Sequence, residues 1–449
     1  MAVALIILGA GKGTRMQSEL PKVMHEIAGA PMLVHAMKAG ESLEPSRIVV
    51  VAGHGADVVE AGALDWNPLA QIALQNEQLG TAHAVAQARD ILEGFEGDAI
   101  VLYGDTPFIS EQTLQGMIQA RATNDVVVLG FEADDPAKYG RLVTDGDSLE
   151  RIVEFKDATP QERRIALCNS GVVAAKASVL FDLIDAVGND NASGEYYLTD
   201  IVGIARGRGL SAGVVICDEA ETLGVNSREE LARAETIFQR FKRLEAFENG
   251  VTMQAPETVI FAHDTFVGRD AVIEPNVVFA NGVSVESGAR IRAFSHLEGC
   301  HVSRGAVVGP YARLRPGTEL AEDTKIGNFV ETKNAVIAEG AKVNHLSYIG
   351  DAEVGKAANI GAGTITCNYD GVFKHQTVIG ADAFIGSNTM LVAPVTVGDH
   401  AMTASGSVIT SDVPSGDLAI ARAKQDNKTG FGKRLMDKLR AKKASKNKG

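Results

Sequence analysis

Several features that would point to particular classes of protein are scarce in this 449-residue chain. Its four cysteines are widely spaced and match no metal-binding pattern, so we expect free thiols in a reducing cytoplasm. No apolar run reaches the ~18–20 residues that cross a bilayer, which argues against a membrane-spanning helix. Negative charge outweighs positive charge, giving a formal net charge of −14, and this argues against general binding of nucleic acid by the bulk surface.

Aromatic residues are also few, at 5% of the chain, whereas glycine is abundant at 47 residues. With an apolar fraction of 45%, this composition indicates a globular protein with tight turns and aliphatic layers. The length suggests two or three domains at roughly 150 residues each. The run MAVALIILGAG has no basic stretch before its apolar residues, so it predicts a buried strand and not a signal peptide.

The chain contains regions with different patterns. Residues 1–226 alternate apolar runs such as VALIIL, RIVVVAG, AIVLYGD and DVVVLGF with helical stretches, which predicts an α/β sheet with helices on both faces. Residues 227–249 predict a single helix, with Ser227 and Glu230 spaced as a capping box. Because this helix has few apolar positions, we interpret it as a linker between domains.

The third region, 250–449, carries aliphatic residues at every sixth position, for example Val267, Ile273 and Phe279. A helix needs a spacing near 3.6 and an alternating strand a spacing of 2. A period of six predicts short parallel strands joined by tight turns and stacked as a β-helix of roughly nine coils. The period breaks near 299–307, 331–342 and 367–376. We expect inserted loops or irregular corners there, and loops on a rigid scaffold often carry function.

A glycine-rich, cationic loop, LGAGKGTRMQSELPK, occupies residues 8–22. Glycines let backbone N–H groups approach a phosphate closely, and the start of a helix adds a favourable field. The spacing of these glycines fits neither the P-loop nor the dinucleotide-binding fingerprint. From spacing alone, the segment is either a phosphate-binding loop or a plain turn with solvated cations.

The same loop resembles the L-x-x-G-x-G-T-R-M…P-K signature of nucleotidyltransferases that activate sugar phosphates. Further matching motifs follow in order: QNEQLGTAHA, LYGDTPFI, YGR, IVEFKDA, CNSG, GEYYLTD, GVNSR, NFVETKNA, NHLSYIGDAEVG and NIGAGTITCNYDG. Nearly end to end, the chain is similar to the bacterial family that joins an N-acetylglucosamine-1-phosphate uridylyltransferase to a glucosamine-1-phosphate N-acetyltransferase. The resemblance implies a Rossmann-like mixed sheet in 1–226, the linker helix 227–249, and a left-handed parallel β-helix of hexapeptide repeats in 250–449.

This resemblance implies two reactions of UDP-N-acetylglucosamine synthesis, which supplies peptidoglycan and lipopolysaccharide precursors. The β-helix would transfer an acetyl group from acetyl-CoA to glucosamine 1-phosphate. The N-terminal domain would then transfer uridylyl from UTP to N-acetylglucosamine 1-phosphate with the help of Mg²⁺, releasing pyrophosphate. The resemblance also implies a cytoplasmic homotrimer assembled through the β-helix, with no nucleic-acid partner and no insertion into a membrane.

For uridylyl transfer the attacking phosphate is already ionised, so catalysis needs positioning and neutralisation of charge, not a general base. The resemblance makes Arg15 and Lys22 the catalytic cations and Asp105 and Asn226 the Mg²⁺ ligands. From position alone, Asp105 is better explained as a turn residue and Asn226 as a neighbour of a helix cap, so their metal role rests on the resemblance. The nucleotide and sugar contacts that the resemblance implies are Leu8, Gly9, Ala10, Gly11, Lys22, Gln75, Gly80, Thr81, Tyr103, Gly104, Asp105, Gly140, Glu154, Asn169, Thr199 and Asn226.

For acetyl transfer a base must remove a proton from the substrate ammonium, and His345 is the candidate because imidazole titrates near neutral pH. A lone histidine in a repeat is more often structural, although His345 lies at a break in the period. The resemblance makes His345 the base and Glu331 the residue that orients it. The glucosamine 1-phosphate contacts it implies are Arg315, Lys333, Tyr348 and Asn359. The acetyl-CoA contacts it implies are Ala362, Asn368, Tyr369, Ser387, Ser405 and Arg422, of which Asn368 and Tyr369 are also expected to hold the sugar.

Two other functions stay open at this point. One is a sugar nucleotidyltransferase whose β-helix only assembles an oligomer, which the loop around His345 argues against. The other is a non-catalytic regulator with the same two-domain plan, which would not be expected to keep all four of the proposed cations and metal ligands. The tail 433–449 carries eight Lys and Arg against one Asp, and it is either a disordered solvated tail or an attractor of the CoA phosphates.

Overall fold

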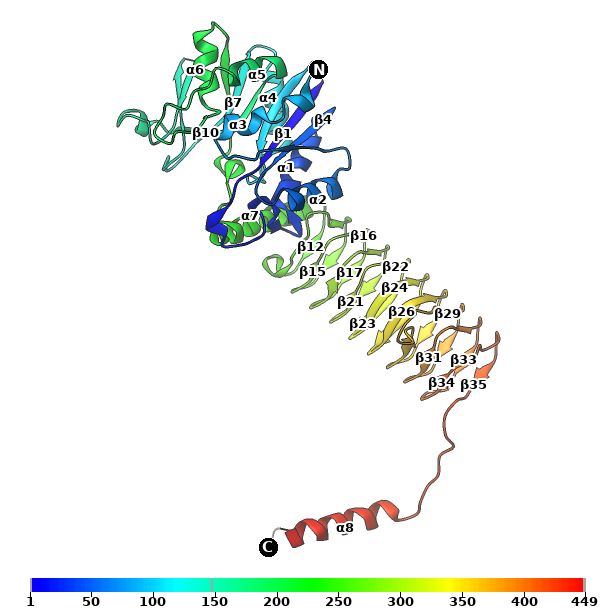
Figure 1. Cartoon of the computed structure of the whole chain (residues 1–449). Coiled ribbons are helices and arrows are strands. Elements are labelled where there is room, and N and C mark those ends of the chain that lie inside the picture. Colours follow the sequence, from blue (N-terminus) through cyan, green and yellow to red (C-terminus); the bar gives the residue numbers. More distant parts are fainter. Residues whose placement is uncertain (1, 147, 447–449) are drawn as a thin grey trace. The chain divides into compact units, whose positions relative to one another are not determined.

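The computed structural model describes residues 2–146 and 148–446. The chain divides into two compact units, Met1–Leu244 with Phe261–His263, and Glu245–Ile260 with Asp264–Gly449. The first unit is a sheet with helices, and the second is a succession of short strands (Figure 1).

The first unit is built on a mixed sheet with the strand order β11-β7-β10-β6-β1-β4-β5. β10 is antiparallel to both of its neighbours on this path, and the other pairs are parallel. The four apolar runs that were predicted as strands are β1, β4, β6 and β7, and their nearly continuous burial is typical of a sheet covered on both faces. The strands of this unit are β1 (Val3–Gly9), β2 (Glu26–Ile27), β3 (Ala30–Pro31), β4 (Arg47–Ala52), β5 (Gln71–Leu74), β6 (Asp98–Tyr103), β7 (Val126–Glu132), β8 (Arg141–Asp145), β9 (Ser148–Val153), β10 (Leu167–Lys176) and β11 (Ala212–Cys217).

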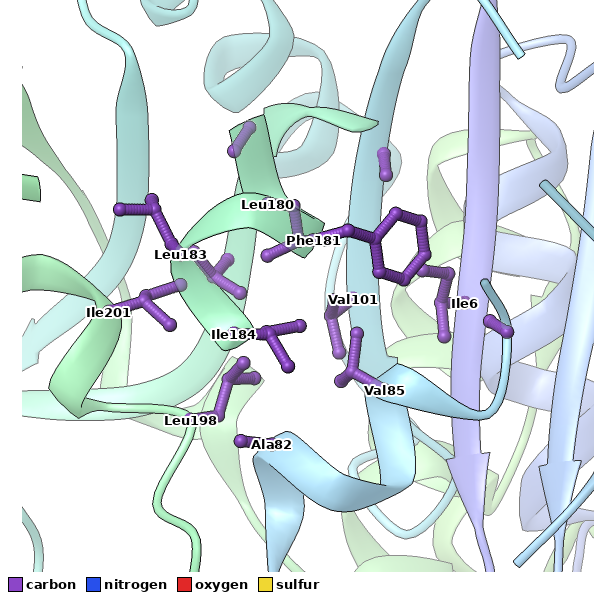
Figure 2. Close-up of a cluster of buried hydrophobic side chains, with 14 of the residues drawn as sticks. Ile6, Ala82, Val85, Val101, Leu180, Phe181, Leu183, Ile184, Leu198 and Ile201 are labelled. Atoms are coloured by element: carbon purple, nitrogen blue, oxygen red, sulfur yellow. The ribbon is translucent and has the colours of Figure 1, made fainter. Parts of the chain in front are cut away.

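Helices cover both faces of this sheet, as predicted. Successive side chains of β1 alternate between the faces: Ile6 packs in a cluster with α3, α5 and α6, whereas Leu5 and Ile7 pack in a cluster with α1, α2 and α4. Figure 2 shows the first cluster, in which Val85 of α3 and Phe181 of α5 point toward the strands. The helices are α1 (Met32–Glu41), α2 (Ala56–Trp66), α3 (Thr81–Ala86), α4 (Glu111–Ala120), α5 (Ala177–Ile184), α6 (Asp200–Gly207) and α7 (Arg228–Glu248).

Helix α7 packs on the first unit. Its residues Leu231, Ala234 and Phe238 join a buried cluster with Ile27 and Met32. The expectation that this helix has too few apolar positions for a core was wrong for its N-terminal half, because three apolar residues at helical spacing suffice to cover a small cluster.

The second unit is a parallel β-helix, as the six-residue period predicted. The ladders between successive coils are parallel, and the periodic aliphatic residues, such as Ile273 and Ile291, point inward and are buried. One ten-stranded column consists of β12 (Thr252–Met253), β14 (Val272–Ile273), β17 (Arg290–Ile291), β20 (Val307–Val308), β23 (Lys325–Asn328), β25 (Lys342–His345), β27 (Asn359–Ile360), β30 (Phe384–Ile385), β33 (Met402–Thr403) and β35 (Leu418–Ala419). The other strands are β13 (Phe266–Val267), β15 (Val278–Phe279), β16 (Val283–Val285), β18 (His296–Leu297), β19 (Cys300–Val302), β21 (Arg313–Leu314), β22 (Thr318–Leu320), β24 (Glu331–Ile337), β26 (Tyr348–Val354), β28 (Ile365–Cys367), β29 (Thr377–Ile379), β31 (Met390–Val392), β32 (Val395–Val397) and β34 (Val408–Ile409).

The three breaks in the period have different origins. At the first two, a coil is shortened by one residue: Val283, for example, pairs with Cys300, 17 positions later. Only the third break, 367–376, holds an inserted loop, since Ala352 pairs with Thr377. The prediction of irregular corners is therefore right for the first two breaks, and the prediction of an inserted loop is right for the third.

The basic tail forms helix α8 (Phe431–Lys446), which is exposed along its whole length, whereas a disordered tail was one of the two expectations. Residues 447–449 of the predicted tail lie outside the described residues. Of the helices that the structure describes, none combines the length and the apolar character needed to cross a membrane.

Candidate active sites

The carboxyl ends of the parallel strands in the first unit border a pocket of about 300 Å³. β1 and β6 end side by side, and the N–H of Gly104 donates to the carbonyl oxygen of Leu8 at 3.0 Å. Ligands of open α/β sheets bind at this edge. Of the predicted contacts, the pocket is lined by Leu8, Ala10, Gly11, Lys22, Gln75, Gly80, Thr81, Tyr103 and Asp105.

The glycine-rich loop packs against Lys22, which is the first residue of the short 3-10 helix Lys22–Met24. Gly13 has a φ of +57°, and a Cβ at this position would lie 2.6 Å from Cβ of Lys22. A larger residue would push the loop away from Lys22, so glycine is needed here for both its conformation and its size. Gly11 meets no such obstacle and is exposed beside the pocket.

Lys22, Asp105 and Asn226 form one polar cluster at the pocket. The ammonium of Lys22 makes a salt bridge with Asp105 and donates a hydrogen bond to Oδ1 of Asn226 at 3.0 Å. Asn226 is held in place because its N–H donates to the carboxylate of Glu230 at 2.6 Å. Half of the predicted capping box is therefore present. The N–H of Glu230 donates to Oγ of Ser227 as predicted, but the carboxylate of Glu230 accepts from the N–H of Asn226 and not from that of Ser227. The two oxygens that were predicted to bind a metal thus converge on one cation.

Arg15 is not part of this cluster. It lies exposed on the short 3-10 helix Thr14–Met16 and makes no hydrogen bond or ion pair with the described residues. The loop that carries it is tied down at Met16, whose carbonyl oxygen accepts a hydrogen bond from Nε of Arg228 at 3.2 Å. His25 places its Nδ1 3.2 Å from the same guanidinium.

The predicted sugar contacts gather beside a second pocket. The N–H of Asn169 donates to the carbonyl oxygen of Gly140 at 2.9 Å, and the hydroxyl of Thr199 donates to Glu154 at 3.2 Å. Burial raises the pKa of the Glu154 carboxyl above its ordinary value. Tyr103 lines both pockets, so the nucleotide and sugar candidates lie at neighbouring pockets.

In the second unit, one column of the β-helix collects the candidate base and most of the candidate acetyl-CoA contacts. The ladder from β25 through β27 and β30 to β33 keeps a single register. Continued past the ends of β27, β30 and β33, that register aligns His345, the last residue of β25, with Ala362, Ser387 and Ser405. The next coil contributes Arg422, whose guanidinium donates to the carbonyl oxygen of Ser405 at 2.6 Å.

His345 is oriented by Asn328, not by Glu331. The two ladder partners Asn328 and His345 are joined by a contact of 2.7 Å between Oδ1 of Asn328 and Nδ1 of His345. Because an amide oxygen only accepts, Nδ1 carries the proton and Nε2 is left as the acceptor that a base needs. Glu331 instead makes an ion pair of 2.9 Å with Arg315. Among the described residues, the structure shows no contact that would let Glu331 orient His345 as expected, since its carboxylate is paired with Arg315.

A cationic group lies on the neighbouring column. Arg315 and Lys333 are on adjacent coils, and Lys374 comes from the inserted loop. The positive charges of Lys374 and Arg315 lower the pKa of the Lys333 ammonium below its ordinary value. Arg313 is a more distant partner of Glu331, at 3.9 Å.

The remaining acceptor candidates are placed around this group. Tyr348 is paired with Glu331 between β24 and β26. Asn359 is in β27, which pairs with the strand β25 that carries His345. Asn368 donates to Asp351, and the hydroxyl of Tyr369 donates to the carbonyl oxygen of Gly371 at 2.6 Å.

Comparisons with known proteins agree with both units. A model of MobA-like NTP transferase domains matches residues 5–166, and a model of bacterial transferase hexapeptide repeats matches residues 376–411. The chain is 69% identical over 449 residues to the bifunctional protein GlmU of Ruegeria sp. (strain TM1040), with 100% of both chains covered. It is 64% identical over 446 residues to that of Jannaschia sp. (strain CCS1), covering 99% of this chain and 98% of the relative.

The chain belongs to the GlmU family. This confirms the resemblance found in the sequence, and with it a nucleotidyltransferase domain on a mixed sheet followed by a left-handed β-helix of hexapeptide repeats. It also confirms a bifunctional transferase that uses nucleotide and acyl substrates. The single-activity enzyme and the non-catalytic regulator are therefore set aside.

Several residues near the GlmU-family sites were missed by the sequence analysis. Asn328 and Lys374 lie at the second site, and His25 and Arg228 hold the loop of the first. Two of these residues had a signal in the sequence, since Arg228 ends the motif GVNSR and Asn328 begins the motif NFVETKNA.

Proposed function

We propose that this GlmU-family chain makes UDP-N-acetylglucosamine in two steps, each in its own unit. The second unit acetylates glucosamine 1-phosphate with acetyl-CoA, and the first transfers uridylyl from UTP to the N-acetylated product. One observation carries the proposal: each unit has its own group of converging polar side chains, Lys22 with Asp105 and Asn226 in one, and His345 with Asn328 in the other.

In the first unit the pocket at the ends of β1 and β6 takes the nucleotide, and the adjoining pocket takes the sugar. Backbone N–H groups at Gly11 and the ammonium of Lys22 bind phosphate oxygens. Arg15, whose side chain is exposed on its loop, adds a second positive charge on the departing pyrophosphate. Tyr103 lies between the two pockets and fixes the position of the sugar phosphate relative to the nucleotide.

Asp105 and Asn226 are the residues that would hold Mg²⁺. Their oxygens already share one cation, the ammonium of Lys22, so the arrangement suits a positive charge at this place. One carboxylate and one amide oxygen suit Mg²⁺, which keeps several waters and takes its other ligands from the phosphates. Bound Mg²⁺ would neutralise charge on the phosphates of UTP. Lys22 has to leave these oxygens when the metal binds, and it is then available to a phosphate.

Removal of divalent metal is expected to stop uridylyl transfer and to spare acetyl transfer. The proposed acetyl transfer uses a histidine base and needs no metal, whereas the proposed nucleotide site relies on it. The measurement follows pyrophosphate release and CoA release after addition of EDTA, and then after excess Mg²⁺ is restored. Uridylyl transfer that persists fully in EDTA would contradict the roles of Asp105 and Asn226.

In the second unit His345 removes a proton from the amine of glucosamine 1-phosphate through Nε2, and the amine attacks the acetyl carbonyl of acetyl-CoA. The amine nitrogen forms a bond to the acetyl carbon, the bond from that carbon to the CoA sulfur breaks, and His345 gives the proton to the departing thiolate, which leaves as CoA thiol. Arg315, Lys333 and Lys374 bind the phosphate of the sugar. The acetyl-CoA lies along the column Ala362, Ser387 and Ser405, which starts at His345.

The assembly that we propose is a homotrimer joined through the β-helix, located in the cytoplasm. A hexapeptide-repeat prism has three flat faces, and cyclic assemblies close without leaving an open interface. The four cysteines, all free in the structure, support a reducing compartment. The substrates are small molecules, and the net negative charge gives no reason to propose nucleic acid as a partner.

The two halves are expected to work when separated, and the place of the cut matters. A fragment 1–249 keeps α7 and should convert N-acetylglucosamine 1-phosphate. A fragment 1–226 loses Leu231, Ala234 and Phe238, so it should melt about 10 °C lower, because several apolar side chains lose their cover. Thermal melting and pyrophosphate release from both fragments check this. Equal stability of the two fragments would show that α7 contributes nothing to the first unit, and an inactive but folded 1–249 would contradict the independence of the halves.

A further inference from the structure

The buried amide at the nucleotide pocket is held from behind by a histidine that the proposed mechanism does not use. Gln75 directly follows β5, and it is only 3% exposed. Its side-chain Nε2 donates to the carbonyl oxygen of Gly80 at 3.3 Å and lies 3.0 Å from Nδ1 of His83. Gln75 and Gly80 both line the pocket, whereas His83 does not.

These contacts determine which atom of the amide is offered to a ligand. A backbone carbonyl only accepts a hydrogen bond, so the amide nitrogen of Gln75 is the atom that faces Gly80. The same nitrogen then donates to Nδ1 of His83, and the proton of the neutral ring sits on Nε2. Oε1 of Gln75 has no partner among the described residues, which leaves it as an acceptor for a ligand in the pocket.

Both residues are fixed by their backbones. The N–H of Gln75 donates to the carbonyl oxygen of Ala52 at 2.8 Å. His83 is on α3, whose opposite side packs into the core through Ala82 and Val85 (Figure 2). The backbone positions that carry the imidazole and the amide are therefore fixed by the fold, which favours the contact between the two side chains.

A second amide competes for the same ring. Nε2 of Gln87 lies 3.2 Å from Nε2 of His83, but it already donates to the carbonyl oxygen of His83 at 2.9 Å. A neutral imidazole accepts at one nitrogen only. The contact of His83 with Gln75 is shorter than its contact with Gln87, and Gln75 is the more buried of the two amides. Leaving the amide of Gln75 without its hydrogen bond would therefore cost more, so we take Nδ1 as the accepting nitrogen of His83.

We propose that His83 is a positioning residue for base selectivity: by accepting from Gln75 it keeps Oε1 turned toward the base, so that the site selects uracil over cytosine. This rests on the proposed function, in which Gln75 contacts the base of UTP. Uracil presents a ring N–H donor at N3, which suits Oε1. Cytosine presents an acceptor at N3, which would meet Oε1 with no proton between them. Without His83 only the longer contact with the carbonyl oxygen of Gly80 opposes a half rotation of the amide, which would offer its NH₂ group to cytosine.

The test compares kcat/KM for UTP and CTP, with N-acetylglucosamine 1-phosphate as the second substrate, in the full-length enzyme. His83→Leu removes the acceptor, and the ratio of UTP to CTP should fall by about tenfold or more, as expected when a buried hydrogen bond no longer discriminates. His83→Asn and His83→Gln form a matched pair. The asparagine can place an oxygen near the position of Nδ1 and should keep most of the ratio, whereas the glutamine reaches the position of Nε2 and should lose it. Gln87→Leu is a control on the same helix and should keep the ratio.

A purely structural role for His83 would lower turnover of UTP and CTP together and leave their ratio unchanged, and this result would overturn the proposal. So would a wild-type enzyme that uses both nucleotides equally. If His83→Leu is too slow to assay, calorimetry gives the ratio of the dissociation constants for UTP and CTP, which should change in the same direction. If the Leu variant does not fold, the comparison of the Asn and Gln variants tests the proposal. Failure of the proposed function looks different, because wild-type enzyme would then turn over neither nucleotide.

Discussion

Replacing Asp105 with alanine is expected to abolish uridylyl transfer and to leave acetyl transfer at the wild-type level. Asp105 follows β6 at the edge where the nucleotide pocket opens, and its carboxylate is the only one in the cluster with Lys22 and Asn226. Its removal takes away the charged ligand proposed for Mg²⁺ and leaves the Lys22 ammonium unpaired. We expect a loss of about 10³-fold or more, the scale for removing a group that stabilises charge in the transition state.

The measurement is a pair of assays on one preparation: pyrophosphate release from UTP with N-acetylglucosamine 1-phosphate, and CoA release from acetyl-CoA with glucosamine 1-phosphate. Asp57→Ala, at an exposed position on α2, serves as the control and should change neither rate. A comparable fall in both activities of Asp105→Ala would point to unfolding, and normal uridylyl transfer would remove Asp105 from the mechanism.

His345→Ala should reduce acetyl transfer by about 10²–10⁴-fold, the range for a positioned general base. His345 is exposed at the end of β25, so the aliphatic layers of the β-helix should survive its loss. The loss should appear in kcat and not in KM, because deprotonation matters on the way to the transition state. Raising the pH should partly restore the variant, since more of the substrate amine is then already unprotonated.

Two variants make this prediction sharper. Asn328→Ala removes the hydrogen bond to Nδ1 and should give a smaller loss that is again confined to kcat. His296→Ala, at an exposed ladder position in another part of the β-helix, should have no effect. Uridylyl transfer should be unchanged in all three. A His345→Ala enzyme with normal kcat and a raised KM would make His345 a binding residue, and the base would have to be another group.

The fold was predictable because its signals are local. Buried parallel strands appear as continuous apolar runs, and each coil of a β-helix repeats its inward-facing aliphatic residues at the same spacing. The packing of α7 was not predictable in the same way. Leu231, Ala234 and Phe238 acquire a partner surface only when Ile27 and Met32 are brought to them by the tertiary structure.

The site residues were predictable where they stand in a sequence motif. They were less predictable where the site depends on which residues of neighbouring coils are placed side by side. Lys22 and Asp105 lie far apart in the sequence, yet both stand in motifs of the family, and the structure joins them. Asn328 is next to His345 only because the ladder brings successive coils into register, at a place where the six-residue period is interrupted. Lys374 reaches Lys333 from an inserted loop, whose path no periodic pattern specifies.

The most direct test of the central claim offers the purified chain glucosamine 1-phosphate, acetyl-CoA, UTP and Mg²⁺ together, and follows the products by mass spectrometry. The account predicts that N-acetylglucosamine 1-phosphate appears first and that UDP-N-acetylglucosamine and pyrophosphate follow. It also predicts that omission of acetyl-CoA prevents both products, and that added N-acetylglucosamine 1-phosphate restores the second. Formation of a UDP-sugar from unacetylated glucosamine 1-phosphate as the main product, or no acetylated intermediate at any time, would contradict it.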